Sequence, residues 1–175
     1  MGKYPHELSG GMRQRVLIAM ALSSGADLLI SDEATRALDV TIQAGILKLL
    51  SDLGSKLNLS TIFISSNIAL VATVCQRLGI LYSGELMEIG PTKEILRKPG
   101  HLYTKSFLAS LPGIEKKGQK LPIIKGRIPD PLDKPDGCMF SPRCPMFVEE
   151  CSRITPVLTE LSPGHYVACT RGEEK

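Results

Sequence analysis

Two short apolar runs, at residues 26–31 and 60–65, most constrain what this chain can fold into. A short, continuous apolar run is typical of a strand buried on both faces of a parallel sheet. Between the two runs, residues 40–57 place apolar side chains on one stripe at helical spacing, which predicts an amphipathic helix. Strand, helix and strand in this order predict a parallel α/β fold.

The same alternation continues on both sides of these runs. Helices are predicted over residues 11–23, 40–57, 68–75, 91–97 and 101–111, and strands over 26–31, 60–65, 78–82 and 85–89, with a hairpin turn at Ser83 and Gly84. The first helix is apolar on nearly all sides, which is typical of a helix packed inside a larger domain. The pattern is that of half a doubly wound α/β domain.

Composition excludes several classes of protein. The chain has 175 residues, is 43% hydrophobic and carries a net charge of only +3. No basic block is interleaved with aromatic residues, so nothing supports nucleic-acid binding. No apolar run is long enough to cross a bilayer, and the N-terminus does not resemble a signal peptide. A soluble, cytoplasmic chain is therefore expected, held at any membrane by other subunits.

Ser9, Gly10 and Gly11 stand where the first predicted helix begins. A serine before a helix caps its free N–H groups, and glycines let a backbone approach a ligand closely. The start of a helix also carries the positive end of its dipole. These residues predict a site for a phosphate-sized anion, although an ordinary capped helix would show the same three residues.

A pair of carboxylates, Asp32 and Glu33, follows the first buried strand, and Asp39 comes shortly after. Open α/β sheets bind ligands at the carboxyl ends of their strands. Phosphoryl transfer needs a metal ion to neutralise charge and an oriented nucleophile, and two adjacent acids at this edge suit both tasks.

In this order and spacing, the glycine pair, the acidic strand end and Asp39 resemble the signature motif, Walker B strand and D-loop of an ABC-transporter nucleotide-binding domain. The fuller string from Tyr4 to Val16 is most similar to the branch that powers peptide and nickel importers. The resemblance implies the C-terminal half of a P-loop-type ABC nucleotide-binding domain, a mostly parallel sheet with flanking helices.

The resemblance also implies roles for these residues. Asp32 would hold Mg²⁺ of an ATP complex, Glu33 would polarise the attacking water, and Asp39 would contact a partner subunit. Ser9, Gly10 and Gly11 would complete the ATP site of a second ATP-binding subunit in a head-to-tail dimer. Transmembrane permease subunits would place the protein in the cytoplasm, peripheral on the inner face of the membrane.

Several positions depart from the family pattern. No Gly-Lys-Ser/Thr phosphate loop (Walker A) occurs, and Ala34 replaces the usual proline, which we expect to loosen the turn after Glu33. In the switch loop, Ser66 stands for the histidine that contacts the γ-phosphate, and Asn67 for its acidic neighbour. The expected function is a partial ATP-binding subunit of an importer of oligo- or dipeptides. Whether the chain is an ATPase stays open, because a non-hydrolysing structural or redox-responsive copy fits the same departures.

Four cysteines, Cys138, Cys144, Cys151 and Cys169, gather near the C-terminus. They resemble the C-terminal extension of oligopeptide and dipeptide transporter ATPases, in some of which they ligate a [4Fe–4S] cluster. Their wide spacing suits a cluster better than zinc, which usually takes close pairs; zinc and disulfides remain alternatives. Cys75 is expected to be an apolar core residue.

The sequence thus predicts three parts. Residues 1–111 form the partial nucleotide-binding domain, residues 112–136 a linker rich in proline, glycine and lysine, and residues 137–175 a small irregular cysteine-rich extension.

Overall fold

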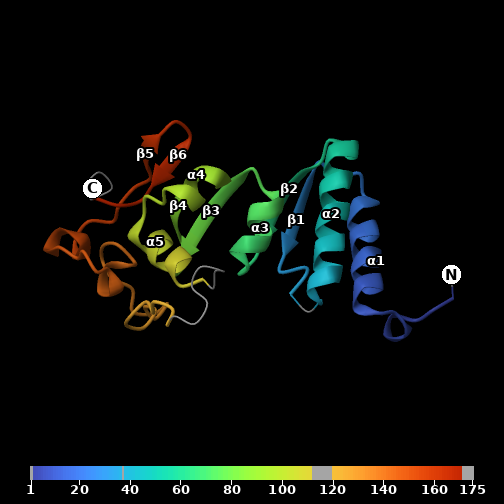
Figure 1. Ribbon diagram of the computed structural model, residues 1–175, viewed down its shortest axis with the longest axis horizontal. Coiled ribbons are helices and arrows are strands. Elements are labelled where there is room, and N and C mark those ends of the chain that lie inside the picture. The colour runs from blue at the N-terminus through green and yellow to red at the C-terminus, as the bar shows by residue number, and fades with distance from the viewer. Residues whose placement is uncertain (1, 37, 112–119, 171–175) are drawn as a thin grey trace. The chain divides into compact units, whose positions relative to one another are not determined.

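The computed structural model describes residues 2–36, 38–111 and 120–170, which fall into two compact units (Figure 1). The first unit is Met1–Cys75 and the second is Gln76–Lys175. The division predicted from the sequence, with boundaries at residues 111 and 136, follows the motifs of each segment. Contacts between residues do not test it, so it stays a prediction.

The first unit alternates helices and strands, as predicted. Its elements are η1 (Pro5–Glu7), α1 (Gly10–Leu22), β1 (Leu28–Asp32), α2 (Val40–Leu57), β2 (Ser60–Ile64) and α3 (Ile68–Val74). β1 and β2 pair in parallel, in a register that runs from Leu28 opposite Ser60 to Asp32 opposite Ile64. The parallel α/β pairing inferred from the two apolar runs is confirmed.

Helix α2 ends where the sequence pattern ends because both termini are capped. The Asp39 carboxylate accepts a hydrogen bond from the Ile42 N–H at 2.9 Å. At the other end, Asn58 takes the left-handed conformation that commonly stops a helix. The apolar stripe buries Ile46 and Leu50 against Ile18 of α1, which forms the core of this unit.

The predicted burial of this unit was wrong in two places. One face of the β1–β2 ladder packs against the core, but Ile30 and Ile62 on the other face are 60% and 49% exposed. Helix α1 buries only Gly11 and Ile18, and Met20 is 65% exposed. Apolar faces need covering elements on each side, and in the part of the chain that is described only one side has them.

The second unit is built on an antiparallel sheet. Its elements are β3 (Arg77–Tyr82), β4 (Glu85–Pro91), α4 (Thr92–Arg97), α5 (Leu102–Ala109), η3 (Ser141–Arg143), η4 (Glu149–Ser152), β5 (Thr159–Ser162) and β6 (His165–Val167). The strand order is β3-β4-β6-β5. The α/β class is confirmed, while among the described strands only β1 and β2 pair in parallel.

The predicted hairpin between β3 and β4 is present. Ser83 and Gly84 both have positive φ angles, 49° and 84°, as a two-residue hairpin turn of the primed type requires. The β5–β6 hairpin was not predicted. Its turn contains Gly164 at φ 74°, and β6 pairs with β4, so the last segment of the chain completes the sheet that β3 begins.

The core of the second unit joins this sheet to the cysteine-rich region. Tyr82, Met87, Met139 and Phe140 are buried together. The Tyr82 and Phe140 rings meet edge to face with centroids 5.4 Å apart, a favourable aromatic geometry. Cys138 and Cys144 pack against these four buried side chains, so the fold of the cysteine region depends on the sheet.

Candidate functional site

The carboxyl ends of β1 and β2 bring the predicted acidic residues and the switch loop together. The Glu33 N–H donates to the Ile64 carbonyl at 2.9 Å, which extends the parallel ladder by one residue. The Glu33 Oε1 atom then accepts a hydrogen bond from the Ser66 N–H at 2.9 Å. Glu33 and Ser66, which lie 33 residues apart in the sequence, are therefore in direct contact.

Glu33 adopts an unusual backbone conformation at this edge. Its φ angle is 44°, in the left-handed region that non-glycine residues seldom occupy. Such a conformation costs on the order of 1–3 kcal/mol and persists only where neighbouring contacts enforce it. Here the hydrogen bonds to Ile64 and Ser66 enforce it, so both the backbone and the carboxylate of Glu33 are fixed.

The turn after Glu33 is held without the proline that the family pattern would place there. The Arg36 N–H donates to the Glu33 carbonyl at 3.0 Å, and the Gln43 side-chain amide donates to the Thr35 carbonyl at 2.6 Å. The expected loosening of this turn stays a prediction, because these two hydrogen bonds do not measure how freely the turn moves. Sequence reasoning missed Gln43, whose signal is an amide in the first turns of an amphipathic helix.

The switch loop contributes its backbone to the site. The Ser66 side chain is exposed, and only its N–H reaches Glu33. Asn67 caps α3, since its side-chain oxygen accepts from the Leu70 N–H at 3.2 Å. Asparagine is as good a helix cap as aspartate, so the substitution at residue 67 preserves the loop while removing a charge.

Ser9 is the predicted cap of α1, with its Oγ accepting from the Met12 N–H at 3.3 Å. The two glycines after it have a packing role that the sequence did not indicate. A Cβ atom on Gly10 would lie 3.0 Å from Leu38, and one on Gly11 would lie 2.8 Å from Ile42. The start of α1 thus packs tightly against residues on both sides of Asp39.

Asp32 and Asp39 differ in how their carboxylates are engaged. Asp39 caps α2, as described above, and is exposed. Asp32 ends β1 and is exposed at the same edge as Glu33. Oxygen ligands of this kind are those that Mg²⁺ prefers, so the donor chemistry of Asp32 fits that ion.

The four C-terminal cysteines are close in space. The Cys138 N–H donates to the Cys151 carbonyl at 2.8 Å. Burial raises the pKa of the Cys138 thiol, a hydrogen bond from the Phe140 backbone partly offsets this rise, and the neighbouring Cys169, Cys144 and Cys151 raise the pKa further. Within the described residues, however, no three His, Cys, Asp or Glu side chains converge as they would on a single metal ion.

The two predicted metal centres need different arrangements of their ligands. A lone zinc ion needs four ligands at about 2.0–2.3 Å, which forces the sulfurs into one tight tetrahedron. In a [4Fe–4S] cluster, cysteine thiolates are the ligands, and a larger inorganic core separates them. The described residues show neither arrangement, so both the cluster and zinc stay predictions.

Comparisons with known proteins identify the family of this chain. Residues 1–36 match the ABC transporter family model, and residues 87–151 match the model of the oligopeptide/dipeptide transporter C-terminal region. A peptide import ATP-binding protein of Brucella ovis is 45% identical over 99% of this chain, and that of Brucella melitensis is equally similar. A second Brucella ovis protein of this name is 41% identical over 98% of the chain.

Solved structures agree at the level of the fold. A metal-chelate type ABC transporter in an inward-facing conformation matches 61% of this chain and 41% of its own, with 33% identity and a TM-score of 0.52. An ATP-binding cassette in its ADP conformation has a TM-score of 0.50 at 21% identity, covering 57% of this chain and 40% of its own.

The fold and the strand-end site define an ABC-type nucleotide-binding protein. The chain belongs to the family of ABC-transporter ATP-binding subunits, in its oligopeptide/dipeptide branch. It spans about half the length of the curated relatives it matches, 53% in the case of the first Brucella ovis protein. Among the described residues, no helix has the length and apolar character that a membrane span requires.

Proposed function

We propose that this chain provides the signature helix, the acidic strand end and the switch loop of an ATP-binding subunit that drives the import of oligo- or dipeptides. The observation that carries the proposal is the contact between the Glu33 carboxylate and the Ser66 N–H. It joins the two segments that must cooperate at the γ-phosphate, at the sheet edge where such folds bind ligands.

In the proposed mechanism, Glu33 orients the attacking water. The Ser66 N–H fixes one carboxylate oxygen, which leaves the other oxygen to accept a proton from water. Asp32 would hold Mg²⁺, and that ion supplies neutralisation of the phosphate charge. The Ser66 hydroxyl is a shorter hydrogen-bond donor to the γ-phosphate than a histidine would be, and it carries no charge near neutral pH.

Two further ABC surfaces are proposed for the first unit. The capped start of α1 presents N–H groups and a positive dipole end, which suit the phosphates of an ATP bound by a second subunit. The Asp39 carboxylate keeps one oxygen beyond its capping bond, which is available for that subunit. The permease subunits of the importer would then hold the protein on the inner face of the membrane.

For the second unit, we propose a [4Fe–4S] cluster held by Cys138, Cys144, Cys151 and Cys169. The cluster would cross-link segments that are poor in regular structure, a usual role for metal centres in small folds. The raised pKa of the Cys138 thiol means that metal binding must displace a proton there, so assembly is favoured at higher pH.

A second candidate function is a degenerate subunit that binds but does not hydrolyse ATP, while a partner subunit performs the reaction. The observation in its favour is the exposed serine at residue 66, where the family pattern has histidine. Hydrolysis by a reconstituted domain distinguishes the two candidates.

The test joins residues 1–175 to the upstream half of the Brucella ovis relative. The fusion should hydrolyse ATP, and Glu33→Gln should lower kcat by about 100-fold or more, as loss of a general base does. Glu94→Gln, at an exposed position of α4, is the matched control. A fusion that binds ATP with no turnover would favour the degenerate subunit. The chain alone should bind no ATP at micromolar concentrations.

A further inference from the structure

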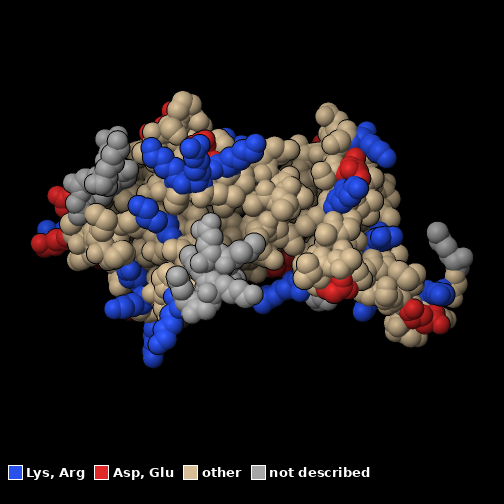
Figure 2. All heavy atoms as spheres, in the orientation of Figure 1, with Lys and Arg blue, Asp and Glu red and all other residues tan. Residues whose placement is uncertain are grey.

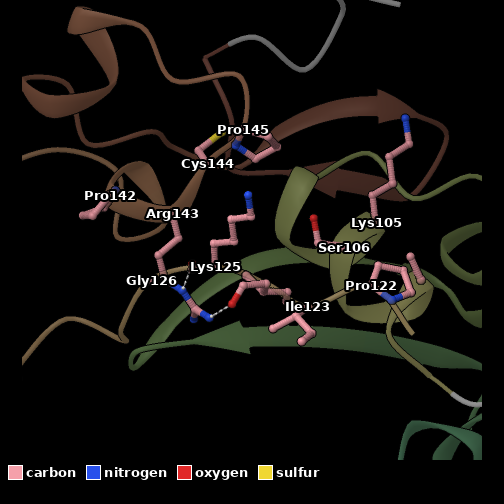
Figure 3. A pocket seen from close by; sticks show the side chains of 12 residues that line it. Lys105, Ser106, Pro122, Ile123, Lys125, Gly126, Pro142, Arg143, Cys144 and Pro145 are labelled. Carbon is pink, nitrogen blue, oxygen red and sulfur yellow. Dashed lines mark hydrogen bonds between the residues drawn. The ribbon is translucent and has the colours of Figure 1, made fainter. Parts of the chain in front are cut away.

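A cavity of about 620 Å³ opens in the second unit, and none of its lining residues is proposed to act on ATP. Its walls are one face of α5, the extended segment 122–126 and the loop 142–145 (Figure 3). The volume is in the range of small-molecule sites, about 300–1,000 Å³. The segment 122–126 lies in the stretch that was predicted to be a linker, and no cavity was predicted there.

Arg143 builds one wall of this cavity. Its guanidinium donates from Nε to the Lys125 carbonyl at 3.0 Å, from Nη2 to the Ile124 carbonyl at 2.9 Å, and from Nη1 to the Tyr82 hydroxyl at 3.1 Å. All three acceptors are uncharged, and within the described residues Arg143 makes no ion pair. The wall is therefore rigid, and it keeps a positive charge without a counter-ion.

All the charged residues in the described lining of the cavity are positive. Lys105 and Lys125 line it together with Arg143, and no Asp or Glu is among the described lining residues. In Figure 3 the Lys125 side chain extends toward the wall formed by Cys144 and Pro145, while Lys105 stands at the rim. A site lined by one sign of charge raises the local concentration of the opposite ion.

The surrounding surface adds to this field. The described stretches 97–111 and 120–127 contain basic residues and no acidic ones: Arg97, Lys98, Lys105, Lys120, Lys125 and Arg127. Figure 2 shows basic side chains, with hardly any acidic ones among them, over the part of this unit where α5 and residues 120–127 lie. An approaching anion therefore meets little repulsion.

Most of the remaining described lining is apolar, and none of it is aromatic. It includes Pro122, Ile123, Ile124, Pro142 and Pro145. Apolar contact suits an aliphatic body, whereas the described lining offers no aromatic ring on which a nucleobase could stack. With no carboxylate to pair with an ammonium group, the cavity disfavours zwitterions such as free peptides.

We propose that this cavity binds a small organic anion that has an aliphatic body and one carboxylate or phosphate head. The head lies against the Lys125 ammonium and the two N–H groups that Arg143 has left over, with the Ser106 hydroxyl within the same cavity. The aliphatic body covers the proline and isoleucine side chains. The site is independent of the proposed ATP chemistry, which concerns the first unit.

The experiment titrates the full ¹⁵N-labelled chain with octanoate and with octyl phosphate, using octylamine, octanol and inorganic phosphate as comparisons. Amide chemical shifts of Ser106, Ile124, Lys125 and Gly126 report the site directly. At least one of the two eight-carbon anions should shift these amides with a Kd of about 1 mM or tighter. The tighter of the two identifies the preferred head group.

Lys125→Gln should weaken this binding by about tenfold, the usual effect of losing one charge-assisted contact. Lys134→Gln is the matched control, because Lys134 is exposed and does not line the cavity. Arg143 is left intact, since its hydrogen bonds hold the wall.

Each remaining outcome would overturn the proposal. If octylamine or octanol shifted the same amides as strongly as the anions do, negative charge would not be needed for binding. Inorganic phosphate binding as tightly as octyl phosphate would remove the role of the aliphatic body. Equal binding by the chain with Lys125→Gln, or no shift with either eight-carbon anion, would place any anion site elsewhere.

Discussion

The Nε2 atom of His165 lies 2.7 Å from the Oε1 atom of Glu88, although the two residues are 77 positions apart in the sequence. Their side chains are 3% and 0% exposed. The same Glu88 carboxylate accepts the N–H of Gly100 at 2.7 Å and that of His101 at 3.0 Å. One buried carboxylate thus joins the central strand β4, the start of α5 and the C-terminal hairpin.

This pair should be costly to break. His165→Ala removes a donor and leaves the Glu88 carboxylate buried with fewer partners, so we expect a loss of about 3 kcal/mol in the free energy of unfolding, measured by urea denaturation. His6→Ala changes an exposed histidine and should have little effect. A loss below about 1 kcal/mol for His165→Ala would mean that the contact is incidental.

His101 should make stability depend on pH. Burial lowers the pKa of His101 to about 4, partly offset by the nearby Glu88 charge. Between the ordinary pKa of about 6.5 and this value, the unfolded chain binds more protons than the folded one, so stability falls as the pH drops through that window. The full loss is about 3 kcal/mol. His101→Asn keeps an acceptor that can cap the helix, and it should reduce the loss of stability between pH 7 and pH 4. Denaturation curves at the two pH values measure the free energy of unfolding of both proteins.

Two glycine substitutions should change stability in opposite directions. Gly45 lies inside α2 with open space around its missing Cβ, so Gly45→Ala should raise the free energy of unfolding by about 0.5–1 kcal/mol. Gly11→Ala would place a Cβ 2.8 Å from Ile42 and should lower it by about 1–3 kcal/mol. Thermal denaturation of both variants gives the sign, and stabilisation by Gly11→Ala would contradict the tight packing of α1 on α2.

Ser66→His should accelerate the fusion protein described above. Histidine reaches farther than serine and interacts mainly with the γ-phosphate, where charge shifts during the reaction. Steady-state kinetics should therefore show kcat rising more than KM falls. Ser51→His, at an exposed position on α2, is the control. If the fusion with Ser66 already hydrolyses ATP as fast as the Brucella ovis relative, the serine does not slow the reaction and the prediction fails.

Anaerobically purified chain should be brown and contain iron and acid-labile sulfide in equal amounts. Cys144→Ser should remove both, because each iron of a cluster takes one cysteine. Cys75→Ser should retain them, since Cys75 lies in the first unit at the end of α3. Colourless protein with stoichiometric zinc would rule out the cluster.

Features that depend on neighbouring residues could be read from the sequence. Helix α2 has the predicted bounds because its apolar stripe and its Asp39 cap are local signals. The turn at Ser83 and Gly84 is equally local. At the candidate site, the sequence predicted Glu33 at the carboxyl end of a strand, whereas its contact with the switch loop was seen only in the structure.

Features that depend on distant partners could not. The β5–β6 hairpin has exposed side chains throughout β5, so it carries no apolar signal, and its pairing with β4 is set by Glu88 and His165. Ile30 was predicted to be buried but is exposed. A sequence shows that a face is apolar, but it does not show which element covers that face. The partner of Glu33 proved to be a backbone N–H, which no side-chain pattern reveals.

The place of β6 beside β4 has a consequence for biosynthesis. Glu88 lies opposite Val167, so the sheet of the second unit cannot close until synthesis has passed residue 167. The first unit pairs strands only 32 positions apart, Leu28 with Ser60, and is ready much earlier. Long-range pairing of this kind folds slowly, and the waiting β3–β4 hairpin exposes an unpaired strand edge to aggregation. A chain that stops before residue 165 would contain every strand of the first unit and lack the strand that joins β4 to β5 in the second.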